Sequence, residues 1–200
     1  MTRIGVLALQ GDYAEHATAL RGCGVAPVEV RLPTDLAGLD GIIIPGGEST
    51  TIARLLDAYA LLEPLRALTR AGFPTWGTCA GAIILAERAP GLDRPNLGAM
   101  DIAVRRNAFG SQVDSFETDL DVPAIGAPPF HAVFIRAPII EDAGAGVDVL
   151  ARLENGAVVA AREGALLATA FHPELTRDDR FHRYFARLVQ ESGRQIAGNK

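Results

Sequence analysis

The amino-acid sequence predicts an α/β fold with a mostly parallel central sheet, helices on both of its faces and an antiparallel addition. Strand-like runs that are apolar at nearly every position alternate with helical patterns through the first half of the chain. Such runs are typical of parallel strands buried on both faces. The chain has 200 residues and contains no linker, repeat or low-complexity segment. We therefore expect residues 1–200 to form a single domain.

The first half divides into strand–loop–helix units. The first strand is predicted at residues 4–9, and Gly11 ends it. Asp12 is then expected to cap a helix over residues 13–20, since aspartate accepts hydrogen bonds from the first backbone N–H groups of a helix. Further strands are expected at 28–30, at 41–44 and in the segment leading to Trp76, with helices at 49–59 and 82–88.

The second half contains strand patterns with few helices between them. These strands are predicted at residues 100–104, 115–120, 132–135, 147–150, 158–161 and 166–171. Residues 177–190 form the closing helix, because Phe181, Tyr184, Phe185 and Leu188 fall on one apolar stripe at helical spacing. This change of pattern predicts the antiparallel addition.

The composition excludes several classes of protein. Hydrophobic residues make up 48% of the chain and charged residues 22%, which is unlike a disordered chain. The net charge of −5 would repel a phosphate backbone, so we expect no nucleic-acid partner. The longest apolar stretch, at 80–86, is far shorter than the roughly 18 residues that span a bilayer, and no charged-then-apolar leader opens the chain. We expect a protein of the cytoplasm with no membrane partner.

The lysine and cysteine content of the chain limits the reactions that it can catalyse and indicates its redox compartment. The single lysine is the terminal Lys200, so an imine on an interior lysine amine is excluded. The two cysteines, Cys23 and Cys79, lie in different contexts and indicate a reduced compartment more than a disulfide. Cys23 lies among glycines at a predicted helix end and is expected to be inert.

Cys79 is the candidate nucleophile. It lies in the sequence GTCAG at residues 77–81, between a predicted strand and a predicted helix. Glycines two residues before and two after a nucleophile permit the sharp turn that exposes its side chain. The N-terminal end of the following helix favours a thiolate. This pattern alone leaves a buried core cysteine beside a tight turn as an equal alternative.

His172 is the candidate base, and Glu174 its orienting carboxylate. His172 follows an apolar strand at a proline break, and extended backbone would place Glu174, two residues later, on the same side. A strand-end histidine with a local carboxylate is the alternative. The remaining histidines lack such a pattern: His16 and His182 fall on predicted helices, where a solvated or interface role is expected, and nothing assigns a role to His131.

The sequence PGGEST at residues 45–50 follows a buried strand and precedes a helix. Its backbone N–H groups are expected to converge into an anion-binding turn that could stabilise an oxyanion. The segment lacks the lysine and the spacing of a phosphate-binding P-loop. The histidines and cysteines do not have metal-ligand spacing, so neither a metal nor a cofactor is expected.

Taken together, these segments resemble one family, the glutaminase subunits of pyridoxal 5'-phosphate synthase (PdxT/SNO type), which are triad-type class I glutamine amidotransferases with a flavodoxin-like fold. The resemblance runs from near the N-terminus to about residue 190. The segments are IGVLALQG at 4–11 with Glu15 and His16, PGGESTT at 45–51, GTCAG at 77–81, RRNAFG at 105–110, FIRAP at 134–138 and FHPEL at 171–175.

The resemblance implies roles for individual residues. Cys79 would be the nucleophile, His172 the general base and acid, and Glu174 its orienter. Backbone N–H groups of Gly47 and Ala80 would form the oxyanion hole. The glutamine-binding positions would be Gly47, Glu48, Ser49, Arg106, Ile135 and Arg136. Nothing carries over to residues 121–129.

The resemblance also implies a reaction and a partner. L-Glutamine would be hydrolysed to glutamate and ammonia, and the ammonia would pass to a separate synthase subunit that makes pyridoxal 5'-phosphate. Gln10 and the segment around His16 are our candidates for the face that senses this partner. Two alternatives stay open: an amidotransferase subunit serving another pathway, and a non-catalytic regulatory subunit built on the same fold.

Overall fold

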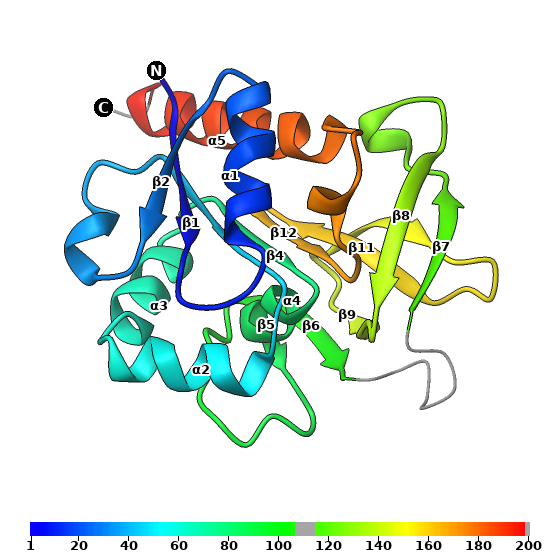
Figure 1. The fold of residues 1–200 in the computed structure, drawn as a ribbon, viewed down its shortest axis with the longest axis horizontal. Coiled ribbons are helices and arrows are strands. Elements are labelled where there is room, and N and C mark those ends of the chain that lie inside the picture. The colour runs from blue at the N-terminus through cyan, green and yellow to red at the C-terminus, as the bar shows by residue number, and fades with distance from the viewer. Residues whose placement is uncertain (107–114, 199–200) are drawn as a thin grey trace.

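The computed structural model describes residues 1–106 and 115–198 (Figure 1). Its centre is one large sheet with the strand order β2-β1-β3-β4-β12-β11-β9-β6-β5, and β10 pairs with β11 beside this path. The strands of this sheet are β1 (Arg3–Leu7), β2 (Ala26–Val30), β3 (Gly41–Ile44), β4 (Thr75–Thr78), β5 (Ala86–Arg88), β6 (Met100–Arg105), β9 (Ile139–Ala143), β10 (Asp148–Arg152), β11 (Val158–Glu163) and β12 (Leu166–Thr169).

The pairing confirms the predicted fold class. Along the sheet order β2-β1-β3-β4-β12, each strand is parallel to the next. β11 runs antiparallel to β12, β9 and β10, and β9 runs antiparallel to β6. A separate antiparallel hairpin of β7 (Ser115–Leu120) and β8 (Phe130–Ile135) completes the addition. β12 pairs directly with β4, with Thr169 opposite Thr78, so segments about ninety residues apart end side by side.

Helices cover both faces of the sheet, as predicted (Figure 1). One core packs β3 residues Ile42 and Ile44 against α2 (Ser49–Ala58), α3 (Leu62–Arg70) and α4 (Ala80–Leu85). The other core packs Ile43 and Trp76 against α1 (Tyr13–Gly22) and α5 (Arg180–Gly198). The change of face at consecutive isoleucines follows from the two-residue period of a strand.

Several elements differ from the sequence prediction. The helix expected at 82–88 is α4, which starts at Ala80 and ends at Leu85, and residues 86–88 instead form β5, where Ala86 pairs with Met100. α3 and β9 were not predicted. β9 contains the acidic residues Glu141 and Asp142, which hide its strand pattern, and pairing with β6 and β11 decides its conformation.

Within the described ranges, the structure contains no helix that combines the length and the apolar character needed to cross a bilayer.

Candidate active site

Cys79 occupies a strained turn between β4 and α4. Its backbone has φ 48° and ψ −107°, a conformation that a residue with a side chain rarely adopts. Gly77 and Gly81 are required by close packing: a Cβ on Gly77 would collide with the carbonyl of Gly81, and a Cβ on Gly81 would collide with the carbonyl of Ile44. The glycines predicted to permit a sharp turn therefore do so by letting backbone approach backbone.

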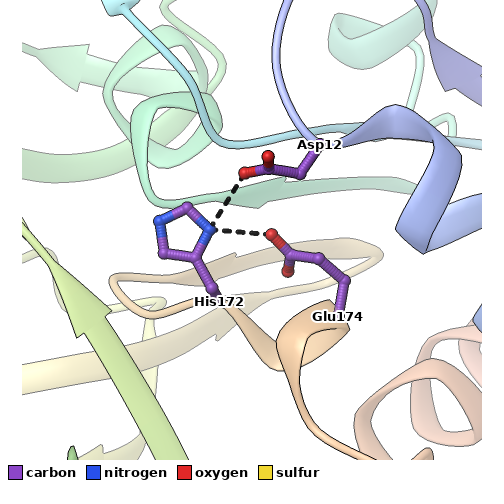
Figure 2. Close-up of side chains that lie close together, drawn as sticks. All are labelled: Asp12, His172 and Glu174. Carbon is purple, nitrogen blue, oxygen red and sulfur yellow. Dashed lines mark hydrogen bonds and ion pairs between the residues drawn. The ribbon is translucent and has the colours of Figure 1, made fainter.

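His172 and Glu174 lie next to each other after the end of β12. His172 Nδ1 is 2.7 Å from Glu174 Oε1. Figure 2 shows this contact as a dashed line. The backbone N–H of His172 donates to the carbonyl of Val133 at 2.9 Å, which fixes the histidine against β8. Glu174 belongs to a 3₁₀ turn, η3 (Pro173–Leu175), and not to the extended segment that the sequence analysis assumed. The predicted contact is nevertheless formed.

Asp12 is a second carboxylate at the same imidazole nitrogen. Its Oδ2 lies 3.3 Å from His172 Nδ1, so both dashed lines in Figure 2 meet at one atom. The predicted capping role is wrong, because the Asp12 side chain makes no hydrogen bond to the start of α1. Sequence reasoning missed the contact, although the position of Asp12 after the first parallel strand places it at the edge of the sheet where ligands bind.

The electrostatics favour a protonated His172. Burial by itself would lower the pKa of His172, but hydrogen bonding to Asp12, Cys79 and Glu174 prevails and raises it well above its usual value. Burial raises the pKa of Glu174, and the neighbouring His172 opposes this shift. An imidazolium held in this way is the natural partner of a thiolate at Cys79.

The loop before α2 packs against this pair. Gly46 has no room for a side chain, because a Cβ there would collide with His172 Cε1 and lie 3.3 Å from Cys79 Cβ. The backbone N–H of Glu48 donates to Gln10 Oε1 at 2.8 Å. The Glu48 carboxylate caps α2 by accepting hydrogen bonds from the N–H groups of Thr50 and Thr51 at 3.1 and 2.6 Å.

These groups surround a cavity of about 440 Å³. All the predicted site residues except Glu174 line it, and Glu174 is buried behind His172. The predicted residues in its wall are Gly47, Glu48, Ser49, Cys79, Ala80, Arg106, Ile135, Arg136 and His172. The lining residues that sequence reasoning did not assign to the site are Asp12, Ile83 and Pro138, and Gln10 was assigned only to the partner face.

Another part of the cavity wall contains two positively charged side chains, Arg106 and Arg136, and the strained backbone at the end of β8. Arg106 donates to Glu48 Oε1 at 3.1 Å and to the carbonyl of Gly91 at 3.0 Å. Arg136 has φ 42°, in the left-handed region. The carbonyl of Ile135 lies 3.9 Å from Cys79 Sγ. Residues 107–110 of the RRNAFG segment lie outside the described residues.

The other histidines and Cys23 occupy three different environments. His16 and His182 are fully buried, so the solvated or interface role expected of them is wrong. His131 is exposed on β8 between Glu117 and Asp119, and hydrogen bonds to both carboxylates raise its pKa. Cys23 is half-buried, and its Sγ lies 3.8 Å from Asp179 Oδ2.

Asp12, His172 and Glu174 are close enough to hold a metal ion, since one ligand atom from each lies within 4.8 Å of the others. The same atoms already contact one another through His172 Nδ1. A metal ion would have to displace the proton from that nitrogen, so the acid–base pairing by itself explains why the three groups are close.

Comparisons with known proteins show which family this chain is similar to. The chain is 59% identical over 195 residues to the pyridoxal 5'-phosphate synthase subunit PdxT of Frankia alni, and this match covers 96% of each chain. It is 60% identical over 188 residues to the PdxT subunit of Herpetosiphon aurantiacus, covering 92% of this chain and 99% of that one. A crystal structure described as a glutamine amidotransferase matches with a TM-score of 0.88 and 50% identity, covering 94% of this chain and 98% of that one. The model of the SNO glutamine amidotransferase family matches residues 6–191, and the chain belongs to this family.

Proposed function

We propose that this chain hydrolyses L-glutamine to L-glutamate and ammonia, with residues 1–200 acting as one glutaminase domain, and that it delivers the ammonia to a separate synthase subunit that makes pyridoxal 5'-phosphate. The observation that carries the proposal is the arrangement of three groups. Cys79 is presented on a positive-φ turn, it shares a cavity with His172, and Glu174 lies 2.7 Å from His172 Nδ1.

In the first half of the reaction, the Cys79 thiolate attacks the side-chain amide carbon of glutamine and forms a C–S bond. The carbonyl oxygen becomes an oxyanion, and the proposed donors to it are the backbone N–H groups of Gly47 and Ala80, which both line the cavity. The intermediate collapses as the C–N bond breaks. The His172 imidazolium gives its proton to the leaving nitrogen, which departs as ammonia.

In the second half, the neutral His172 removes a proton from water, and the resulting hydroxide attacks the thioester carbon. Breaking of the C–S bond releases glutamate and restores the thiolate–imidazolium pair. Glu174 stabilises the imidazolium in both halves without itself taking the proton.

The substrate would be held by the walls of the cavity. Arg106 and Arg136 offer positive charge for the α-carboxylate of glutamine, and the Glu48 carboxylate is suited to its α-ammonium group. Ser49 and the backbones of Gly47 and Ile135 complete the proposed contacts. Arg106 already pairs with Glu48 at 3.1 Å, so a bound glutamine would share or replace this ion pair.

A separate synthase is consistent with the composition of the chain. Its single lysine, Lys200, is terminal, so imine chemistry on a pentose phosphate has to take place on another subunit. We propose that the two subunits form a hetero-oligomer in the cytoplasm, and that neither nucleic acid nor a membrane takes part.

The proposal is tested by measuring glutamate release from L-glutamine by the wild-type chain and Cys79→Ala, each with and without the synthase subunit. We expect activity that rises with the partner and is abolished in Cys79→Ala, and labelling of Cys79 by a diazo-ketone analogue of glutamine. Activity that does not respond to this partner would point to another acceptor. No activity and no labelling would favour a regulatory subunit.

A further inference from the structure

Two buried histidines lie behind the triad. His16 comes from α1 and His182 from α5, and neither side chain is exposed to solvent. His16 Nδ1 is 3.0 Å from His182 Nε2. The Trp76 ring meets both imidazoles edge-on, at centroid distances of 5.7 and 5.0 Å. A buried imidazole pair held by three elements of the fold needs an explanation, since burying polar groups is costly unless they are hydrogen-bonded.

The second nitrogen of His16 faces the triad carboxylate. His16 Nε2 lies 3.1 Å from Thr78 Oγ1 and 3.3 Å from Glu174 Oε2. Glu174 Oε1 is occupied by His172, whereas Oε2 is buried and has no hydrogen-bond partner in the described part of the chain. The fold therefore places a possible N–H donor next to the oxygen of Glu174 that His172 leaves unused.

The hydrogen-bond pattern selects one pair of tautomers. If His182 Nε2–H donates to His16 Nδ1, then His16 carries its proton on Nε2, where it can donate to Thr78 Oγ1 at 3.1 Å and lies 3.3 Å from Glu174 Oε2. The only unsatisfied atom of the pair is then the lone pair of His182 Nδ1. The opposite tautomers would bury an unpaired N–H at His182 Nδ1 and set a lone pair of His16 against the carboxylate, which costs more.

Burial keeps this histidine pair neutral. Burial lowers the pKa of His16 well below its usual value, and the nearby His182 and His172 add to the effect. Burial likewise lowers the pKa of His182 to about 4, against a small opposing effect of Asp179. Glu174 itself is faced by His172 and Asp12 as well as by His16. A neutral His16 can donate to the carboxylate without competing with His172 for its role as the cation.

We propose that His16 is a positioning residue for the glutaminase reaction: its Nε2–H holds Glu174 Oε2, with its tautomer set by His182, so that Oε1 stays aligned with His172. This inference rests on the proposed function and deepens it, because it gives His16 of α1 and His182 of α5 a role on the buried side of the triad. His16 acts through Glu174 and does not line the cavity where the substrate would bind.

The test compares His16→Leu with His16→Gln in the chain combined with its synthase partner. Leucine removes the donor, whereas the glutamine amide can place an N–H near the position of His Nε2. We expect His16→Leu to lower kcat about tenfold or more while KM changes less than about twofold, since a buried carboxylate oxygen loses its donor. The acidic limb of the kcat/KM profile should move to higher pH, because Glu174 becomes easier to protonate. His16→Gln should restore most of the kcat and most of the wild-type position of the acidic limb.

The matched control is Phe185→Leu, which reduces packing against Trp76 in the same buried cluster and removes no hydrogen-bonding group. It should lower Tm and leave the acidic limb in place. Equal losses in His16→Leu and His16→Gln with an unmoved acidic limb would overturn the proposal and leave His16 a purely structural residue.

A second readout does not depend on turnover. The ¹H–¹⁵N signal of the His172 Nδ1–H proton should lose its low-field position at a higher pH in His16→Leu than in wild type or His16→Gln. If the wild-type chain released no glutamate, the proposed function would fail, and this titration would still decide whether His16 positions Glu174. Identical titrations in all three proteins would refute the positioning role.

Discussion

Gly46 and His172 are in such close contact that a single methyl group on Gly46 would collide with His172 Cε1 and lie 3.0 Å from Nδ1. The loop that follows β3 and the imidazole that follows β12 therefore have fixed positions relative to each other. The same absent Cβ would also lie 3.3 Å from Cys79 Cβ. One glycine thus sets the distance between the loop that follows β3 and the side chains of His172 and Cys79.

Gly46→Ala should lower glutaminase activity by about a hundredfold, because displacing the imidazole by even about 1 Å disrupts proton transfer. Steady-state glutamate release measures the effect. Gly22→Ala is the matched control, since a Cβ at Gly22 meets nothing within 4 Å, and it should retain full activity. Equal activity of the two variants would show that the loop shifts to make room for the methyl group without displacing His172.

Glu174→Gln should lower kcat by about 10² to 10⁴ while the fold is retained, by analogy with the loss seen when a triad acid is replaced by its amide. An amide cannot stabilise the imidazolium, and its NH₂ group can select the wrong tautomer of His172. Stopped assays for kcat and circular dichroism for the fold check this expectation. A Glu174→Gln variant with near wild-type kcat would rule out Glu174 as the orienting acid.

Asp12→Asn should move the alkaline limb of the kcat/KM profile to lower pH and lower kcat by less than about tenfold. Hydrogen bonding to Asp12 contributes to the raised pKa of His172, so its removal lets the imidazolium lose its proton at lower pH. A pH–rate profile measures the limb. Asp57→Asn, on the exposed side of α2, is the control and should leave the limb unchanged; an unmoved limb in Asp12→Asn would contradict the role of Asp12.

His182 should make the fold sensitive to acid. Its pKa is lowered to about 4 in the folded state from the ordinary 6.5, so the unfolded state binds the proton first. The stability contribution is therefore complete above about pH 6.5 and is lost as the pH falls towards 4. Thermal unfolding from pH 7.5 to 4.5 should show a smaller fall in Tm for His182→Gln than for wild type. Parallel Tm curves would mean that His182 does not titrate in this way.

The local pattern of apolar residues was sufficient to predict much of the fold. Apolar runs such as residues 41–44 and the stripe of Phe181 and Phe185 predict strands and a helix because burial on both faces, or on one stripe, dictates residue type directly. The boundary at Leu85 could not be predicted, since residues 86–88 become a strand only when β6 pairs with them. The unpredicted β9 is likewise decided by its neighbours.

For the site, the sequence by itself singled out the three groups of the proposed chemistry, Cys79, His172 and Glu174. Cys79 lies in a glycine-flanked local pattern, and Glu174 follows His172 by only two residues, a separation at which the two side chains can meet. Only the tertiary structure decided that Asp12 and His16 lie against His172 and Glu174. Those contacts join segments about 160 residues apart, and they exist because parallel pairing brings the ends of β1, β4 and β12 to one edge of the sheet, which no local pattern encodes.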